Sequence, residues 1–503
     1  MLLEDRKRYL NSEGGTLFQH GSYHIALLYP NPYSVAMSSL GYQVIYRAFN
    51  RHPDVACERS FLPDDIPALR NSRKPLTTLE SGRPVGGANC IAISLAYEPD
   101  LAGVFEMLAL ARIPATRAER GDRFPPVILG GPITMSNTLP LTPFVDAIIV
   151  GDGEPVIDQL TEALVKESDT GSRDTLLDDL ASIPGVFVPA RHQDAVPNML
   201  LSPASDLPAV GQIWTPLAEL SNMMLIETSR GCPRFCSFCV MRSAAQPMRE
   251  APLEAVIKAM DTDAPRIGFV GAAVSEYQHI KAALRVAVDN GKGVGISSLR
   301  ADRLDDELVE LLKAGGYRTM TVASDAPSQA MRGKLKKGLR GRHLRHAAEL
   351  AAKHGMRVFK MYVIVGLPGE TTADLDELID FSLELRSVVP RVALGLSPFV
   401  PKLHTPLGDA EFTPIKDQDK SLKYVRRKLR GRVDIRSVSA KWAWVEYRLS
   451  QGGADVGLAA YDAWRSGNRF SDYRKAFTAL VTSEREALTA AQRHGLWQPA
   501  GMR

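Results

Sequence analysis

Apolar runs alternate with amphipathic stretches through the first 190 residues of the chain. The apolar runs lie at 23–30, 90–97, 126–132 and 147–154. Apolar positions at helical spacing follow at 34–49, 101–111 and 155–166. Continuous apolar runs that alternate with helices are typical of a parallel sheet buried on both faces. The pattern predicts an α/β domain of the Rossmann or flavodoxin type over residues 1–200.

A second alternating series begins at Met223. Strands are expected at 223–228, 266–270, 293–297, 319–324, 357–365 and 392–396. Helices are expected between them at 252–261, 276–290, 304–314, 342–354 and 371–386. A complete TIM barrel has eight βα units. The six units found between residues 223 and 410 therefore predict a partial barrel, (β/α)6.

Two further regions show no strand pattern. Residues 201–222 are polar and contain prolines, which predicts a linker between the domains. Residues 411–503 are charged and helical in their spacing, which predicts a helical C-terminal region. Its aromatic residues are expected to pack the core of that region, with a lid over the barrel mouth as the alternative. They are Trp442, Trp444, Tyr447, Tyr461 and Trp464.

Composition is ordinary for a soluble globular protein, with 45% apolar and 23% charged residues. The net charge of +4 is small for 503 residues and by itself does not indicate binding to nucleic acid or membrane. No apolar run approaches the roughly 20 residues that cross a bilayer. The first seven residues are too charged for a signal peptide. We expect a cytoplasmic protein without a membrane span.

Three of the five cysteines fall within eight residues, which favours a metal site over a disulfide framework. Cys232, Cys236 and Cys239 have the spacing C-x₃-C-x₂-C directly after the first strand of the second series. That loop opens on the face of a barrel where active sites lie. Three thiolates can bind three irons of a cubane and leave the fourth iron open for catalysis. A structural zinc knuckle is the alternative, although no fourth Cys or His follows closely.

The cysteine motif resembles the signature of radical S-adenosylmethionine enzymes, and the resemblance covers nearly the whole chain. Residues 30–41, 129–132 and 151–154 resemble the cobalamin-binding-like N-terminal domain of many such proteins. Residues 271–277 and 397–406 resemble a subgroup with that domain. The resemblance implies a catalytic 4Fe–4S cluster on the three cysteines, bound S-adenosylmethionine and a 5′-deoxyadenosyl radical. It also implies a reducing electron donor, such as flavodoxin or ferredoxin, and leaves the substrate unknown.

The same resemblance assigns cofactor contacts near the strand ends. The residues expected at S-adenosylmethionine are Phe238, Gly271, Ser275, Arg300, Ser324, Asp325 and Gly366. Phe238 and Gly366 match positions beside the adenine, and Asp325 matches a ribose-binding acid. Arg300 is expected at the cofactor carboxylate, because a guanidinium fork suits it. The acid that relatives carry just after the position of Gly271 is missing. An ordinary salt bridge is the alternative for Arg300, and a strand-to-helix turn for Gly366.

Cobalamin is the second cofactor in question. Gly130, Gly131, Gly151 and Gly153 follow predicted strands, where open α/β sheets bind ligands. They are expected to line a groove for the nucleotide tail of cobalamin, or to be remnants of a fold kept for docking. The chain has no D-x-H-x-x-G motif. Cobalamin-dependent radical enzymes often lack that histidine, so its absence does not exclude the cofactor.

Three functions compete at this point. With cobalamin, the expected reaction is methylation of an unreactive carbon. Without it, the expected reaction is a radical modification of RNA, protein or a metabolite, as in methylthiotransferases. A non-catalytic iron–sulfur scaffold or sensor is the third. Cys57 and Cys90 are too few for a second cluster and are expected in the core. The basic runs 332–342 and 423–432 could meet RNA phosphates, although a solvated helix face is the favoured interpretation.

Overall fold

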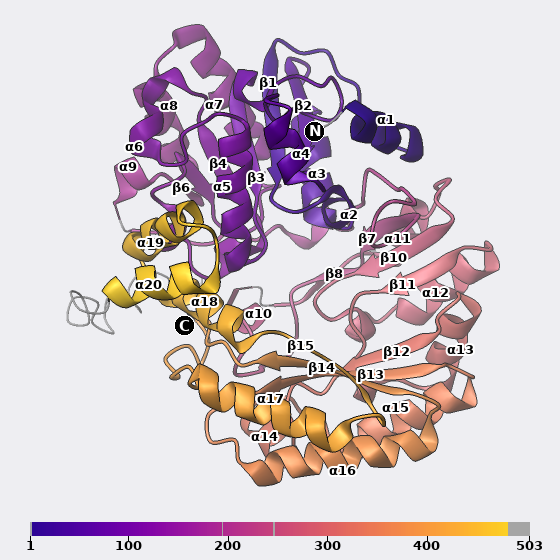
Figure 1. Ribbon diagram of the computed structural model, residues 1–503. Helices are drawn as coiled ribbons and strands as arrows, with labels where there is room; N and C mark the ends of the chain where they lie inside the picture. Colours follow the sequence, from indigo (N-terminus) through magenta and orange to yellow (C-terminus); the bar gives the residue numbers. More distant parts are fainter. Residues whose placement is uncertain (1–2, 194, 245–246, 481–503) are drawn as a thin grey trace. The chain divides into compact units, whose positions relative to one another are not determined.

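Two sets of parallel strands organise the computed structural model, which describes residues 3–193, 195–244 and 247–480 (Figure 1). The chain divides into two units. Unit 1 contains residues 1–202, 211–222 and 448–503, and unit 2 contains residues 203–210 and 223–447. No helix among the described residues is long and apolar enough to cross a membrane.

The sheet of unit 1 has six strands in the order β2-β1-β3-β4-β5-β6. They are β1 (Tyr23–Tyr29), β2 (Val55–Phe61), β3 (Cys90–Ser94), β4 (Val127–Gly130), β5 (Ala147–Ile149) and β6 (Val186–Phe187). The first five run parallel, and β6 is antiparallel to β5. The strand order reverses between β1 and β3, which is the switch point where such sheets bind ligands. This topology confirms the predicted Rossmann- or flavodoxin-like fold.

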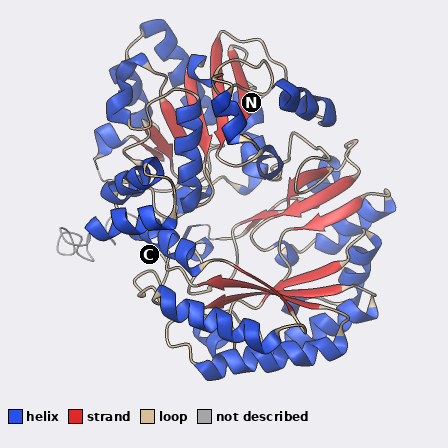
Figure 2. Cartoon of the chain, viewed as in Figure 1, coloured by secondary structure: helices blue, strands red, loops and turns tan. Residues whose placement is uncertain are grey.

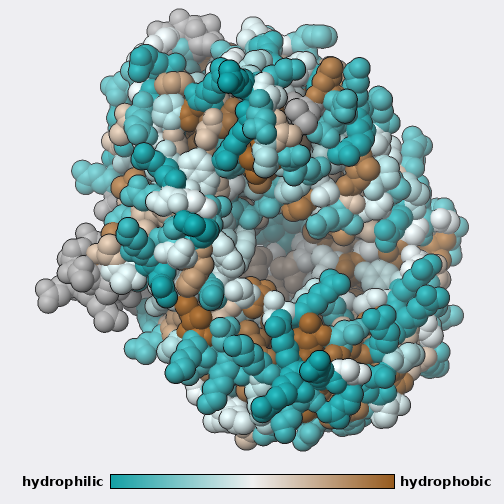
Figure 3. Space-filling view, in the orientation of Figure 1, coloured by the Kyte–Doolittle hydropathy of each residue, from teal (hydrophilic) through white to brown (hydrophobic). Residues whose placement is uncertain are grey.

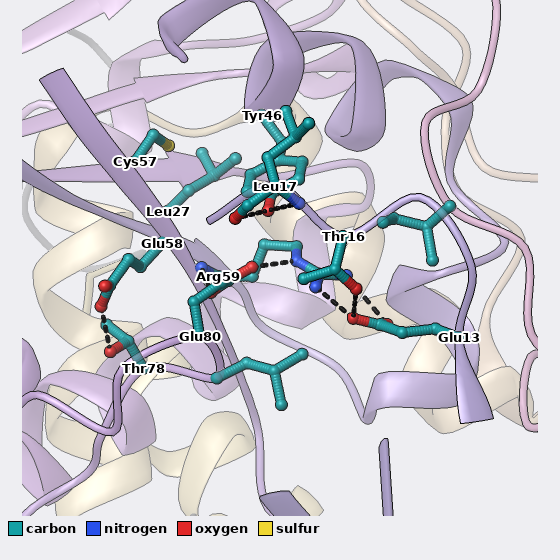
Figure 4. Close-up of polar contacts among 12 residues, drawn as sticks. Glu13, Thr16, Leu17, Leu27, Tyr46, Cys57, Glu58, Arg59, Thr78 and Glu80 are labelled. Carbon is teal, nitrogen blue, oxygen red and sulfur yellow. Dashed lines mark hydrogen bonds and ion pairs between the residues drawn. The ribbon is translucent and has the colours of Figure 1, made fainter. Parts of the chain in front are cut away.

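Strand β2 was not predicted, because Glu58, Arg59 and Ser60 interrupt its apolar pattern. All three side chains find partners. The fully buried Arg59 guanidinium forms ion pairs with Glu13 and Glu80, with 2.6 Å between Arg59 Nε and Glu80 Oε1 (Figure 4). A buried charge is tolerated only when it is paired in this way. The pairs therefore explain how a polar segment becomes an interior strand.

The helices of unit 1 cover both faces of its sheet (Figure 2). Those of its N-terminal part are α1 (Leu3–Ser12), α2 (Tyr33–Ala36), α3 (Leu40–Phe49), α4 (Ile66–Asn71), α5 (Leu101–Leu110), α6 (Arg117–Arg120), α7 (Ile157–Thr170), α8 (Arg173–Ser182) and α9 (Pro189–His192). Cys57 and Cys90 are buried in strands β2 and β3, as expected for core residues. The continuous apolar runs of the sequence therefore end up covered on both sides.

Unit 2 is the predicted partial barrel, built from parallel strands in two hydrogen-bonded sheets, β11-β10-β7 and β12-β13-β14-β15. The strands are β7 (Met223–Glu227), β10 (Arg266–Val270), β11 (Gly293–Ile296), β12 (Thr319–Ala323), β13 (Val358–Val365), β14 (Val392–Pro398) and β15 (Asp434–Ser437). A short antiparallel pair is formed by β8 (Ser229–Arg230) and β9 (Arg249–Glu250). All six predicted strands are present. Strand β15 adds a seventh, which its polar sequence conceals.

The helices of unit 2 follow its strands in alternation. They are α10 (Met241–Ala244), α11 (Leu253–Ala259), α12 (Ile280–Asp289), α13 (Asp306–Ala314), α14 (Gln329–Lys334), α15 (Gly341–Lys353), α16 (Thr372–Val388) and α17 (Ile415–Leu429). The division between the two units falls within α18 (Ala440–Gln451). In Figure 1, α15, α16 and α17 lie on one side of β12–β15. The opposite side of those strands is not covered by these helices.

The C-terminal region is helical, but it divides between the two units. Residues up to Tyr447 belong to unit 2, whereas α19 (Ala454–Arg465) and α20 (Phe470–Leu480) belong to unit 1. Tyr461 packs against Phe105 with ring centroids 5.0 Å apart, and Trp464 lies 5.9 Å from the same ring. The boundary predicted at 410 therefore differs from the observed division. Aromatic packing of α19 onto α5, which is distant in sequence, is the physical reason.

Candidate active site

The cysteine loop begins where β7 ends. Gly231 has φ +88°, a conformation that favours glycine, and it turns the chain directly before Cys232. Cys236 is buried, and Cys232 and Cys239 are half-buried. The Ser237 amide donates to the Leu335 carbonyl at 3.0 Å, and the Ser237 carbonyl accepts from the Leu407 amide at 3.2 Å. Contacts from two distant segments therefore fix the loop.

The three thiols occupy an environment suited to a charged cluster. Burial raises the pKa of Cys236, and the nearby charges of Lys337 and Arg300 oppose that rise. Burial also raises the pKa of Cys239 to about 11. Metal ligation deprotonates a thiol outright, so these raised values do not prevent binding. No three His, Cys, Asp or Glu of the described residues converge as ligands of one ion. A cubane instead takes each thiolate at a separate iron.

An acid–base pair lies beside Cys236. Asp325 follows β12 and has φ +58°, an uncommon conformation for a residue other than glycine. Its carboxylate forms an ion pair with Lys337 Nζ. Ser324 is buried, and its hydroxyl donates to the Ala326 carbonyl at 2.9 Å. Backbone strain at a strand end beside a candidate cluster is typical of functional sites. The structure thus brings Asp325 and Ser324 to the cysteine loop, and it adds Lys337, which the sequence analysis did not single out.

Arg300 is engaged by the chain's own carboxylates. Its guanidinium donates to both oxygens of Asp302, at 3.0 and 3.1 Å, and lies 3.2 Å from Glu276. It also donates to the Lys337 carbonyl at 3.2 Å. The salt bridge that was the alternative for Arg300 is therefore present. A role for Arg300 at the cofactor carboxylate stays a prediction.

Glu276 is the centre of this ionic group and was missed by the sequence analysis. Its side chain is only 5% exposed. It accepts from Arg234 Nε at 2.8 Å and pairs with Arg303 Nε at 2.9 Å, in addition to Arg300. Arg234 belongs to the cysteine loop, between Cys232 and Cys236. Glu276 therefore fastens that loop to the ends of β10 and β11. The sequence signal that could have identified Glu276 is an acid a few residues after Gly271.

Gly271 and Ser275 hold the loops after β10 and β11 together. A side chain at Gly271 would lie 2.7 Å from the Ser229 carbonyl oxygen, so only glycine fits. The Gly271 carbonyl accepts from the Ser297 hydroxyl at 3.0 Å. The buried Ser275 hydroxyl accepts from the Arg300 amide at 3.1 Å. Both positions thus have a packing role, and their contact with S-adenosylmethionine stays a prediction.

Phe238 packs against a small buried apolar cluster that includes Leu335, Leu367 and Phe399. Gly366, which has φ +77°, directly precedes Leu367 in the chain. The contact of Phe238 and Gly366 with the adenine stays a prediction. An apolar surface of this kind can pack against a flat ring.

Glu370 closes the turn after β13, and it should make stability depend on pH. Burial raises its pKa to about 7, although its carboxylate accepts from the Gly366 amide at 3.0 Å. Below about pH 4.5 both the folded and unfolded states hold the proton, and stability is full. As pH rises to about 7 only the folded state holds it, so stability falls. We expect Glu370→Gln to remove about 2 kcal/mol of this pH dependence.

The pH prediction is checked by urea unfolding of native protein and Glu370→Gln at pH 5 and pH 8. The native protein should lose stability relative to the variant between the two values. Glu310→Gln, at an exposed position of α13, is the matched control and should follow the native protein. Parallel pH profiles for native protein and Glu370→Gln would contradict the expected raised pKa.

The glycines assigned to cobalamin have packing reasons of their own. Gly131 has φ +109°, and a Cβ there would lie 2.6 Å from the Leu95 carbonyl oxygen. Gly151 has φ +95°, and a Cβ there would lie 2.3 Å from the Leu200 carbonyl oxygen. Gly130 and Gly153 lie beside Ile149. These close approaches explain why glycine is needed at positions 131 and 151. All four glycines stay partly exposed, and their contact with cobalamin stays a prediction.

The two basic runs separate into different environments. In the first run, Arg332 and Lys337 are buried. In the second, Lys423, Arg426 and Arg427 are exposed on α17. Polar side chains cover the outward side of α16 and α17 (Figure 3). Some side chains of the first run therefore lie in the interior. The second run forms a solvated helix face, which was the interpretation favoured by the sequence.

Two family models match the chain. Residues 41–189 match the N-terminal domain of radical SAM proteins, and residues 226–382 match the radical SAM superfamily. Together with the cysteine loop and the partial barrel, these matches define the class of protein. The chain belongs to the radical S-adenosylmethionine superfamily and is an enzyme of that superfamily. It carries the N-terminal domain found in one part of the superfamily.

Similar proteins differ in what their names state. An uncharacterized protein of Methanocaldococcus jannaschii is 26% identical over 81% of this chain and 83% of its own length. An uncharacterized methyltransferase of Pyrococcus horikoshii is 22% identical over 58% of this chain and 65% of its own length. The ribosomal protein uS12 methylthiotransferase RimO of Sorangium cellulosum is 29% identical over 37% of this chain and 43% of its own length.

Among solved structures, the cobalamin-dependent S-adenosylmethionine radical enzyme OxsB matches with a TM-score of 0.51. The identity is 16%, and the match covers 80% of this chain and 56% of OxsB. At this level of identity the match establishes the shared fold. The chain accordingly spans little more than half of that structure.

Proposed function

We propose that the chain reductively cleaves S-adenosylmethionine at a 4Fe–4S cluster held by Cys232, Cys236 and Cys239. The radical formed would then modify carbon in a substrate. The observation that supports this proposal is the convergence of the cysteine loop with the Asp325–Lys337 pair. The three cysteines supply thiolate ligands for the cluster, and the ion pair beside them supplies fixed charges that a bound cofactor can contact.

The chain's own residues have separable tasks in this scheme. When bound, the cluster supplies the electron that splits the sulfonium of S-adenosylmethionine to give the 5′-deoxyadenosyl radical. Lys337 holds the Asp325 carboxylate in one position, where it can accept from a ribose hydroxyl. Phe238, which is only partly buried, offers an apolar surface to the adenine. Glu276 keeps Arg234, and with it the cysteine loop, in register with the barrel.

For the second half of the reaction we propose cobalamin-dependent methylation of an unreactive carbon. Support comes from the fold shared with OxsB, which is a cobalamin-dependent enzyme by name. A relative named as a methyltransferase adds to it. A relative named as a methylthiotransferase supports a second candidate, a radical enzyme without cobalamin.

The two candidates are separated by reconstituting the full chain anaerobically with iron, sulfide and hydroxocobalamin. After gel filtration, cobalt and iron are measured per chain. The first candidate predicts about one cobalt together with about four irons and a cobalt absorption spectrum. Iron at that level without cobalt would contradict the first candidate and support the second.

A further inference from the structure

One face of the sheet β12–β15 lies away from helices α15, α16 and α17. The register places the residues of this open face side by side across four strands. They are Thr319, Thr321 and Ala323, then Lys360, Tyr362 and Ile364, then Ala393, Gly395 and Ser397, and finally Asp434 and Arg436. Arg426 of α17 donates to the Ser437 hydroxyl. Ser437 therefore faces the helices, and Arg436, its neighbour, faces the other way.

Tyr362 is the prominent side chain of the open face. It is 46% exposed although its strand lies inside the sheet. Its ring covers Gly395, where an added Cβ would lie 2.6 Å from Tyr362 Cδ1. Its neighbour on the other side is Ala323. The ring thus fills the space over Gly395, and its exposed part can contact a flat apolar group.

The open face has an excess of positive charge. Lys360 Nζ lies 2.9 Å from the Tyr362 hydroxyl and 4.4 Å from the ring centroid. Among the described residues, no carboxylate forms an ion pair with Lys360 or Arg436. The acid of this face, Asp434, is already paired with Arg391 at 2.6 Å. Two cations without a carboxylate partner thus flank an exposed aromatic ring, which suits an anion.

The open face adjoins the candidate active site at the end of β12. The amides of Ser324 and Asp325 both donate to the Tyr362 carbonyl, at 3.0 and 3.1 Å. Tyr362 is therefore level with the end of β12, where Asp325 begins the site. Lys360 lies two residues further from that end, about 7 Å away along the strand. A molecule bound between them would point one end toward the cysteine loop.

We infer that the open face binds the substrate, and that the substrate carries a flat apolar part and an anionic group, a phosphate or a carboxylate. The inference rests on the proposed function, because it names the substrate class of the same site. Tyr362 contacts the flat part, and Lys360 and Arg436 hold the anion.

Binding is tested by calorimetry on the anaerobically reconstituted full chain, without S-adenosylmethionine or reductant. The probes are 1-naphthyl phosphate, 1-naphthoate and the uncharged 1-naphthol. The native protein should bind at least one of the two anions at least tenfold more tightly than 1-naphthol. Lys360→Met and Arg436→Gln should each weaken that anion about tenfold, because each removes a charged hydrogen-bond donor. Tyr362→Leu should weaken all three probes.

Lys423→Gln, which removes an exposed cation of α17 outside the open face, is the matched control and should bind like the native protein. A stronger affinity for the phosphate or for the carboxylate identifies the anion. Equal affinity for 1-naphthol and both anions, no binding of any probe, or equal losses in Lys423→Gln and Lys360→Met would overturn the inference. Because the assay needs no radical chemistry, its failure is distinct from a failure to cleave S-adenosylmethionine.

Discussion

Replacing Cys236 with alanine should remove both the iron–sulfur chromophore and the reductive cleavage of S-adenosylmethionine. Cys236 is the buried member of the three thiols, and the loop has no fourth cysteine that could replace it. With two thiolates, a second iron of the cubane loses its protein ligand. Iron should fall from about four per chain to well below one. Formation of 5′-deoxyadenosine should fall to the background rate.

The control for this prediction is Cys57→Ala. Cys57 is buried in β2 of unit 1, so its loss removes a sulfur of similar burial without touching the loop. It should cost about 1 kcal/mol of stability from the cavity and keep the iron content unchanged. If the Cys236 variant retained a full cluster and its activity, Cys236 would not be a ligand.

Replacing Glu276 with alanine should have the second largest effect. The change leaves Arg234, Arg300 and Arg303 without their shared, buried acceptor. Removing one partner of a buried ion pair costs about 3–5 kcal/mol. Because Arg234 lies inside the cysteine loop, the loop should loosen, and the cluster should be lost faster on exposure to a chelator. Urea unfolding measures the stability, and iron release to a chelator measures the cluster.

The control for Glu276 is Glu307→Gln. Glu307 pairs with Lys281 and Arg285 on the exposed side of α12 and α13, so its loss should cost at most about 1 kcal/mol. The potential and electron paramagnetic resonance spectrum of the cluster should change in Glu276→Ala and not in Glu307→Gln. Equal iron release from both variants would mean that Glu276 does not position the loop.

The elements predicted from sequence were those with a local pattern. Strands β7 and β13 are apolar runs, and the cysteine loop is defined by spacing within eight residues. Strand β2 was missed because its Arg59 is neutralised by Glu13, which lies 46 residues away. The local sequence around Arg59 does not indicate a partner so far along the chain.

The same distinction holds in the candidate site. Glu276 meets Arg234 across 42 residues, so neither sequence neighbourhood indicates the pair. Lys337 was part of a basic run whose average character is that of a surface. Its burial follows from the chain path between α14 and α15. Long-range pairing, rather than residue type, decided which charges belong to the site.

The most direct test of the account is the reaction of anaerobically reconstituted native protein with S-adenosylmethionine and a strong reductant. The protein should hold about four irons per chain and form 5′-deoxyadenosine and methionine in equal amounts. Natively purified protein that contains zinc in place of iron, and releases no 5′-deoxyadenosine after reconstitution, would contradict it.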